Sequence, residues 1–150
     1  MVTTYYPDVL PSNTASLVPK TKPISRRSFS QDIQRSYRLV LRDESLAIDY
    51  VTNYRNSILI AGEFGELVTT TDGHPKKRPL TPYHTWVLKR IAKKFADTRS
   101  ETLVIYALKN YPEQFSFLTY LETLRNAKKN KQRRQRTRRR CRIVRAYRTA

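Results

Sequence analysis

Apolar residues in the C-terminal half of the chain recur at the spacing of α-helices. The most regular stripe has apolar side chains at positions i, i+1, i+4 and i+7, which share one face of a helix. Its members are Phe117, Leu118, Leu121 and Leu124. We expect this helix to span residues 111–127, because Asn110 is followed by Pro112 and Glu113, a combination typical of a helix start.

Two further helices are predicted upstream. A helix over residues 81–97 begins with Thr81 as N-cap and Pro82 at the first helical position. Its expected core face consists of His84, Leu88, Ile91, Ala92 and Phe95. A helix over residues 100–110 is capped by Ser100. Its expected buried stripe consists of Leu103, Val104, Ala107 and Leu108. Short connections favour packing of all three helices as one three-helix unit.

Residues 30–57 support two interpretations at their start. A helical face would contain Ile33, Tyr37 and Val40. An alternating strand would contain Tyr37, Leu39 and Leu41. From Ser45 the pattern predicts a short helix that ends near Asn56.

Residues 58–71 are the best candidate for β-structure. Two runs rich in β-formers, residues 58–60 and 67–71, flank a turn between Gly62 and Gly65. We therefore expect a small β-hairpin, followed by an exposed basic loop over residues 74–79.

Together these elements predict a mostly α protein with a small β-hairpin. The sequence divides into three regions by composition. Residues 1–29 contain four prolines among Ser and Thr and predict a flexible N-terminal arm. Residues 30–127 form a single small globular domain. Residues 128–150 form an Arg-rich extension.

The Arg-rich extension carries a dense positive charge. The chain carries 30 Lys and Arg against 12 Asp and Glu, a formal net charge of +18. Residues 128–148, the basic segment, contain no acid. Their cations are Lys128, Lys129, Lys131, Arg133, Arg134, Arg136, Arg138, Arg139, Arg140, Arg142, Arg145 and Arg148. Such a density of positive charge indicates a polyanionic partner, either nucleic acid or an anionic membrane surface.

No Gly or Pro separates the basic segment from the preceding helix, so the helix can continue into it. Cations on all sides would repel one another, and we expect residues from about 130 onward to be frayed when free and to order on a polyanion. From Arg133 to the end all nine cations are Arg, which favours bidentate contacts and RNA over DNA. The alternative is a solvated tail without a specific partner.

A second candidate surface is predicted on helix 81–97, opposite its core face. Aromatic and basic residues alternate there, so cations would hold phosphates while rings stack on unpaired bases. The candidate residues are Tyr83, Trp86, Lys89, Arg90 and Lys93. Two alternatives stay open: Trp86 packs under the N-terminal arm or against the hairpin, or the helix lies on a membrane surface.

Composition removes several classes of site. The chain has three Gly and no glycine-rich phosphate motif, and Cys141 is its only cysteine. We expect no cofactor, no metal site and no enzymatic activity, although Asp43, Glu44 and Asp49 leave a metal-dependent nuclease as a minor alternative. No apolar run is long enough for a transmembrane segment, and the N-terminus lacks the pattern of a secretory signal.

The sequence therefore predicts a small RNA-binding protein that acts through its Arg-rich segment. The same segment would serve as a nuclear or nucleolar import signal recognised by the import machinery. Ile143, Val144 and Tyr147 could mediate self-association. Two alternatives are a structural component of a ribonucleoprotein or virion, of ribosomal or capsid type, and a viral accessory regulator or silencing suppressor. The expected location is intracellular, in the nucleus or nucleolus, or within a particle.

Overall fold

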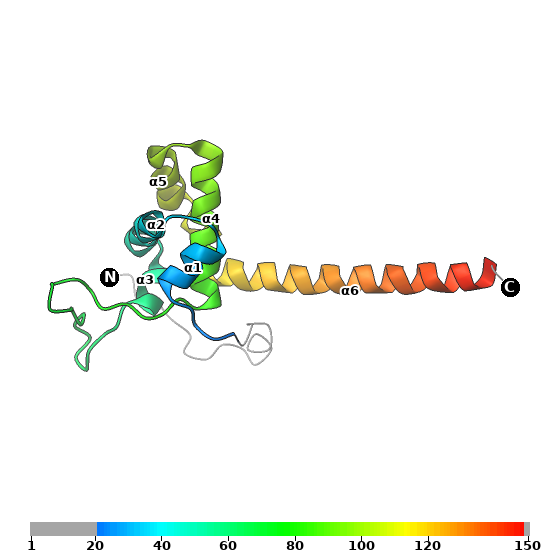
Figure 1. Ribbon diagram of the computed structural model, residues 1–150, viewed down its shortest axis with the longest axis horizontal. Helices are drawn as coiled ribbons and strands as arrows, with labels where there is room; N and C mark the ends of the chain where they lie inside the picture. Colours follow the sequence, from blue (N-terminus) through cyan, green and yellow to red (C-terminus); the bar gives the residue numbers. More distant parts are fainter. Residues whose placement is uncertain (1–20, 149–150) are drawn as a thin grey trace. The chain divides into compact units, whose positions relative to one another are not determined.

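The computed structural model describes residues 21–148, which are mostly helical (Figure 1). The elements are α1 (Arg26–Asp32), α2 (Tyr37–Tyr50), α3 (Thr52–Ile58), α4 (Pro82–Thr98), α5 (Glu101–Asn110), the 3-10 helix η1 (Pro112–Phe115) and α6 (Phe117–Arg148). The chain divides into two compact units between Tyr120 and Leu121, so α6 contributes to both units. Residues 21–120 are called the body below. Within residues 21–148 no helix is both long and apolar enough to cross a membrane.

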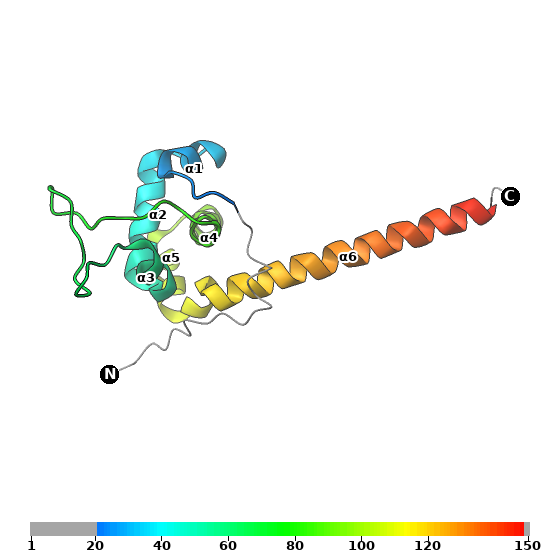
Figure 2. The same cartoon turned by 90° about the horizontal axis from the view of Figure 1, so that it is seen from below.

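The centre of the body is α2, which packs against α1, α3, α4 and α5 (Figure 2). Its buried apolar residues are Val40, Leu46 and Ala47. The prediction that the three C-terminal helices pack together as one unit omitted this helix. α4 does pack on α5, but the helix that contacts both of them is α2. Sequence periodicity did not reveal this role, because the start of α2 fits a strand pattern as well as a helical one.

The folded body begins earlier than the predicted boundary at residue 30. Residues 1–20 of the predicted N-terminal arm lie outside the described residues, but α1 starts at Arg26. Ser25 caps this helix, since its Oγ accepts a hydrogen bond from the Ser28 backbone N–H at 3.2 Å. Phe29 is only 2% exposed. The end of the predicted arm is therefore part of the core.

The region after α1 is helical, which decides between the two interpretations of residues 30–57. The predicted helix from Ser45 to Asn56 is instead the end of α2 followed by α3. The chain breaks at Val51, whose extended backbone (φ −104°, ψ 102°) separates the two helices. Tyr54 of α3 is completely buried.

The predicted β-hairpin is not confirmed. Within residues 21–148 the structure has no strand, only isolated antiparallel bridges, which include Ala61–Leu67, Leu59–Lys77 and Thr69–Pro75. Residues 59–81 form a bridged loop that extends from the helices (Figure 2). Gly65 and Gly73 turn the chain with φ values of 78° and 79°. Pro75 has no N–H to donate, so the Thr69–Pro75 bridge cannot be extended by a hydrogen bond from that residue.

A fourth bridge ties the two ends of this region together. Ile24 and Leu80 exchange two backbone hydrogen bonds, each 2.9 Å long. Leu80 is 1% exposed. The bridge fixes the segment before α1 beside the segment before α4.

Helices α4 and α5 agree closely with their predicted ranges. Thr81 precedes α4, and the N3 residue His84 accepts a hydrogen bond from the Thr81 backbone N–H at 3.1 Å. His84 thus takes the place of the usual Glu or Gln in a capping box. The predicted stripe of α5 is correct for Val104 and Leu108, which are buried, but wrong for Leu103, which is 52% exposed.

The helix predicted over residues 111–127 begins later than expected. Asn110 ends α5, η1 follows, and Ser116 caps α6 by accepting a hydrogen bond from the Thr119 N–H at 3.3 Å. Leu118 is 73% exposed, so its predicted place in the core is wrong. Phe115 of η1, at 1% exposure, is the buried residue instead.

Candidate nucleic-acid interface

The basic segment lies entirely on α6. The helix continues without interruption to Arg148, and every residue from Arg125 to Arg148 is exposed. The predicted fraying from about residue 130 is not confirmed. Lys, Arg, Gln and Ala are good helix formers, and each like-charge pair costs only a few tenths of a kcal/mol.

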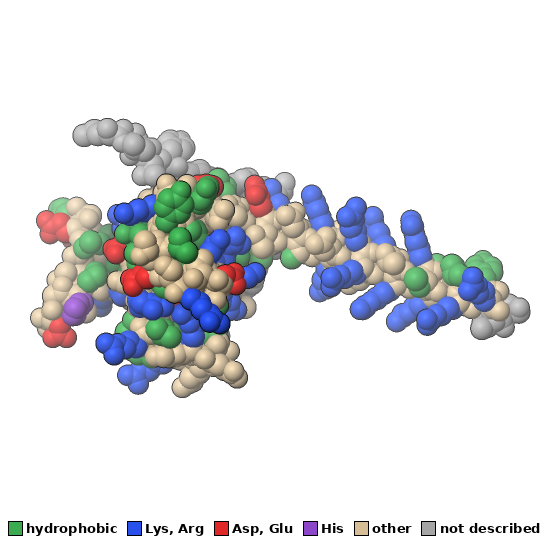
Figure 3. All heavy atoms as spheres, turned by 90° about the horizontal axis from the view of Figure 1, so that it is seen from above, with side chains coloured by type: hydrophobic (Ala, Val, Ile, Leu, Met, Phe, Trp, Pro, Cys, Tyr) green, Lys and Arg blue, Asp and Glu red, His purple; other side chains and the backbone are tan. Residues whose placement is uncertain are grey.

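Cations surround this helix rather than forming one stripe. Successive residues turn by about 100°, so Arg133 and Arg140 point to one side while Arg134 and Arg138 point elsewhere. Figure 3 shows Lys and Arg side chains projecting from both edges of the helix. The only acid in α6 is Glu122, which precedes the segment. An arrangement of this kind can contact phosphates on several sides at once.

Apolar residues interrupt the charge near the end of α6. Ile143, Val144 and Tyr147 are 57%, 53% and 81% exposed. They lie at i, i+1 and i+4 and therefore share one side of the helix. Cys141 is exposed close by.

The predicted aromatic and basic face of α4 is corrected for Tyr83. Its side chain is buried at 6% exposure, and its hydroxyl donates a hydrogen bond of 2.7 Å to the Phe115 carbonyl oxygen. The rings of Phe117 and Tyr120 lie 5.3 and 5.6 Å from the Tyr83 ring. Tyr83 is therefore a core residue, and its ring is not accessible to a base.

Trp86 is half-buried. Its ring lies 5.3 Å from that of Tyr120, and the Arg90 guanidinium lies 4.7 Å from the centre of the indole. Lys89 and Lys93 are exposed on the same helix. The structure brings Trp86 and Arg90 together as a cation–π pair and leaves the two lysines available to phosphates.

Two buried carboxylates occupy the centre of the body, at positions that the sequence marked as possible metal ligands. Asp43 pairs with Arg35 and Arg42, and Glu44 pairs with Arg26 and Lys77. Among residues 21–148 no group of three or more His, Cys, Asp or Glu side chains could hold a metal ion.

The two acids respond differently to their surroundings. Burial raises the pKa of Asp43 and outweighs the opposing charges of Arg35 and Arg42. Burial also raises the pKa of Glu44, but hydrogen bonds and charges from Arg26 and Lys77 outweigh it, so that the net pKa is lowered. Glu44 additionally accepts a 2.9 Å hydrogen bond from the hydroxyl of Tyr54.

Sequence reasoning missed the role of Arg26 and Lys77. Each lies in a short basic cluster next to a proline, residues 26–27 after Pro23 and residues 76–78 before Pro79. Both clusters are visible in the sequence, but only the Ile24–Leu80 bridge shows that they meet.

Comparison with known protein families, curated proteins and solved structures finds no match to this chain.

Proposed function

We propose that the protein binds nucleic acid, with RNA preferred over DNA, through the basic segment of α6. The observation that carries this proposal is a fully exposed helix with twelve Lys and Arg and no acid over residues 128–148. Neutralising phosphates releases condensed counterions, which supplies most of the affinity of such contacts.

Arginine gives the segment a means of recognition beyond charge. A guanidinium presents a planar fork of donors that matches a phosphate or the edge of a guanine. Cations on all sides of the helix suit a partner that surrounds it, such as the walls of a groove or a folded strand. The expected binding is strong at low salt and weakly dependent on sequence.

Residues Lys89, Arg90 and Lys93, with the half-buried Trp86, add a weaker contact in this proposal. The two lysines would hold phosphates, and a base would contact the pair formed by Arg90 and Trp86. Tyr83 has no place in it, because its ring belongs to the core.

Binding to single- and double-stranded RNA and DNA over a salt series tests the proposal. For about 6–10 phosphate contacts, affinity should fall by about 10³–10⁵ between about 50 and 200 mM salt. A variant with all twelve cations replaced by Gln keeps the length of the chain and should lose most binding. Affinity that is independent of salt, or unchanged in this variant, would contradict the proposal.

Two further roles for α6 belong to the same proposal. Its Lys/Arg-rich sequence suits recognition by the nuclear import machinery, which a fusion of residues 128–148 to a reporter would test by its location. Ile143, Val144 and Tyr147 suit self-association once a polyanion has neutralised the surrounding charge. Co-sedimentation with a large particle would favour a structural component of a ribonucleoprotein or virion, whereas activity in an RNA-silencing assay would favour a regulator.

A further inference from the structure

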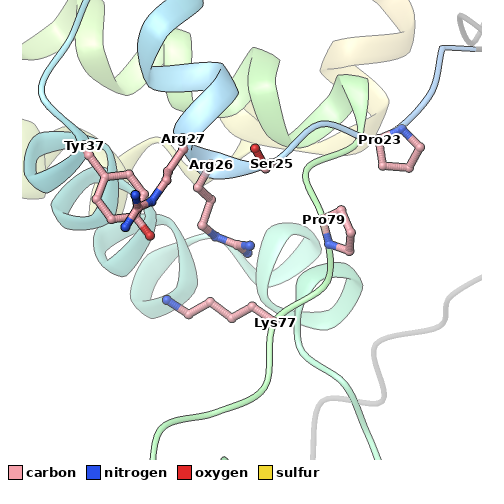
Figure 4. Close-up of a pocket in the computed structure, with 7 residues that line it drawn as sticks. All are labelled: Pro23, Ser25, Arg26, Arg27, Tyr37, Lys77 and Pro79. Atoms are coloured by element: carbon pink, nitrogen blue, oxygen red, sulfur yellow. The ribbon is translucent and has the colours of Figure 1, made fainter.

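The body carries a surface pocket of about 490 Å³ that is separate from the basic segment. Two prolines, Pro23 and Pro79, form one end, on the segments joined by the Ile24–Leu80 bridge. Arg27 and Tyr37 lie at the other end, with Arg26 and Lys77 between (Figure 4). The pocket is an open hollow on the surface and not an enclosed cavity.

The pocket is positively charged. Three cations line it, namely Arg26, Arg27 and Lys77, and no acid does. Glu44 balances one of these charges, because its carboxylate is paired with Arg26 and Lys77. The Glu44 side chain has 0% exposure and does not line the pocket. The opening therefore keeps an excess of about two positive charges.

These cations are held in place before any ligand arrives. Arg26 Nε donates to both Glu44 carboxylate oxygens at 2.8 Å, and Arg26 Nη2 donates to the Arg78 carbonyl oxygen at 2.9 Å. Lys77 Nζ lies 3.0 Å from Glu44 Oε1, a contact that uses one of its three N–H donors. The remaining donors are therefore available to an anion without a large loss of side-chain entropy.

An aromatic ring extends the site beyond a simple anion pocket. The Arg27 guanidinium lies 5.3 Å from the centre of the Tyr37 ring, and Tyr37 is 39% exposed. Planar cations and aromatic rings are the groups on which unpaired bases stack. The pocket thus combines phosphate-binding cations with a stacking platform.

We propose that this pocket binds one nucleoside phosphate of a single-stranded nucleic acid. Arg26, Arg27 and Lys77 contact the phosphate, and the base stacks on the pair formed by Arg27 and Tyr37. That the nucleoside phosphate belongs to a nucleic-acid strand rests on the proposed function. That the ligand carries a phosphate and a base rests on the residues of the pocket alone. A body and a helix that bind one strand together would increase affinity by raising the effective concentration.

Amide NMR spectra of the full chain test this proposal, because they report on the pocket and on α6 separately. The probes are inorganic phosphate, adenosine monophosphate, phosphoserine and a single-stranded RNA of about ten nucleotides. The nucleotide and the RNA should shift the amides of Arg27, Tyr37 and Lys77. Phosphate and phosphoserine should bind at least about fivefold more weakly, because they lack a base.

The outcomes separate the two proposals. Shifts at α6 with none at the pocket would overturn the pocket site and leave the proposed function intact. Shifts at the pocket with none at α6 would overturn the proposed function of the basic segment and leave the pocket site intact. Phosphate or phosphoserine binding as tightly as the nucleotide would overturn the role of the base, and binding of the free nucleotide but not the RNA would overturn the assignment to a strand.

Substitutions should avoid Arg26 and Lys77, which hold the buried Glu44. We expect Arg27→Gln and Tyr37→Leu each to weaken nucleotide binding by about tenfold. Matched controls are Arg38→Gln, an exposed Arg next to Tyr37 that does not line the pocket, and Tyr106→Leu, a Tyr that is 58% exposed on α5. Equal effects of the pocket and control substitutions would contradict the proposal.

Discussion

Arg26 Nε lies 2.8 Å from each of the two carboxylate oxygens of Glu44. The pair connects α1 to the middle of α2, and Lys77 adds a third segment at 3.0 Å from the same carboxylate. Glu44 has no exposed side-chain surface, so this bonding takes the place of its lost hydration. The pair is therefore a structural centre of the body.

Glu44→Gln should destabilise the protein. The amide leaves two cations without their buried counter-charge, a loss that costs about 3–5 kcal/mol in buried pairs. Because the side chains of Arg26 and Lys77 are 16% and 28% exposed and can reach water, we expect the lower end, about 3 kcal/mol. Urea unfolding at neutral pH measures the change.

The lowered pKa of Glu44 gives this variant a pH signature. The stability from its charged form is present above the ordinary pKa of 4.5 and is lost as the pH falls through the lower folded value. The difference between the native protein and Glu44→Gln should therefore narrow in acid. A difference that stays constant would mean that the charge of Glu44 does not matter.

His84 should make the body sensitive to mild acid. Its Nδ1 accepts the Thr81 N–H, and its Nε2 lies 2.7 Å from Ser57 Oγ, so the neutral ring with a proton on Nε2 satisfies both contacts. Burial lowers the pKa of His84 from 6.5 to about 4, against a weaker opposing effect of the Glu44 charge.

The lowered pKa of His84 makes the folded protein less stable in acid. Stability from the neutral ring is complete above pH 6.5 and is lost as the pH falls through about 4. The stability difference between the native protein and His84→Gln should shrink by about 3 kcal/mol from neutral pH to about pH 4. Urea unfolding at several pH values checks this, and an unchanged difference would show that folding does not lower the pKa of His84.

Tyr83→Phe should affect stability and not nucleic-acid binding. The substitution leaves the buried Phe115 carbonyl without the 2.7 Å hydrogen bond from Tyr83, which costs about 1–3 kcal/mol. The matched control is Tyr106→Phe, whose hydroxyl belongs to a residue that is 58% exposed. Loss of RNA affinity with unchanged stability would restore the exposed role that the sequence suggested for Tyr83.

Replacing the nine Arg from Arg133 onward by Lys keeps the charge of the basic segment. If the guanidinium forks contact phosphates or guanines in pairs, RNA affinity should fall by about tenfold or more while the salt dependence stays the same. Fluorescence anisotropy over a salt series separates these two quantities. Equal affinity of the Lys variant would show that charge alone determines binding.

Gln135→Pro tests whether the basic segment binds as a helix. Proline inside a helix costs about 3 kcal/mol relative to Ala and leaves the charge unchanged. The matched control is Gln135→Ala at the same exposed position. Circular dichroism should report loss of helix for the proline variant alone, and RNA affinity should fall with it. Unchanged affinity would show that the cations act from any backbone conformation.

The features that sequence predicted well are local ones. Thr81 and Pro82 marked the start of α4, because a capping box and an N-terminal proline act on the turn that immediately follows them. Ser100 stands at the N-cap position of α5, as predicted, although its side chain makes no capping hydrogen bond. The uninterrupted passage into the basic segment was also readable, since it depends only on the absence of Gly and Pro.

The features that sequence did not predict depend on distant partners. Nothing local shows that Glu44 meets both Arg26 and Lys77, or that the Tyr83 ring is covered by Phe117 and Tyr120. A helical wheel placed Tyr83 opposite the core face, but the residues that begin α6 cover that side of α4. The pocket likewise exists only because the Ile24–Leu80 bridge brings two prolines and two basic clusters together.

The Ile24–Leu80 bridge also limits how far the N-terminal side of the chain can be shortened before the body loses contacts that hold it together. A fragment cut at residue 30, where the change in composition lies, would lack the bridge, the Arg26 partner of Glu44 and the buried Phe29. Lys77 would then be the one cation paired with the carboxylate, beside the Tyr54 hydroxyl, and the loop that carries Lys77 would lose its anchor. The smallest fragment expected to fold therefore begins before Ile24, within the stretch that composition assigns to a flexible arm.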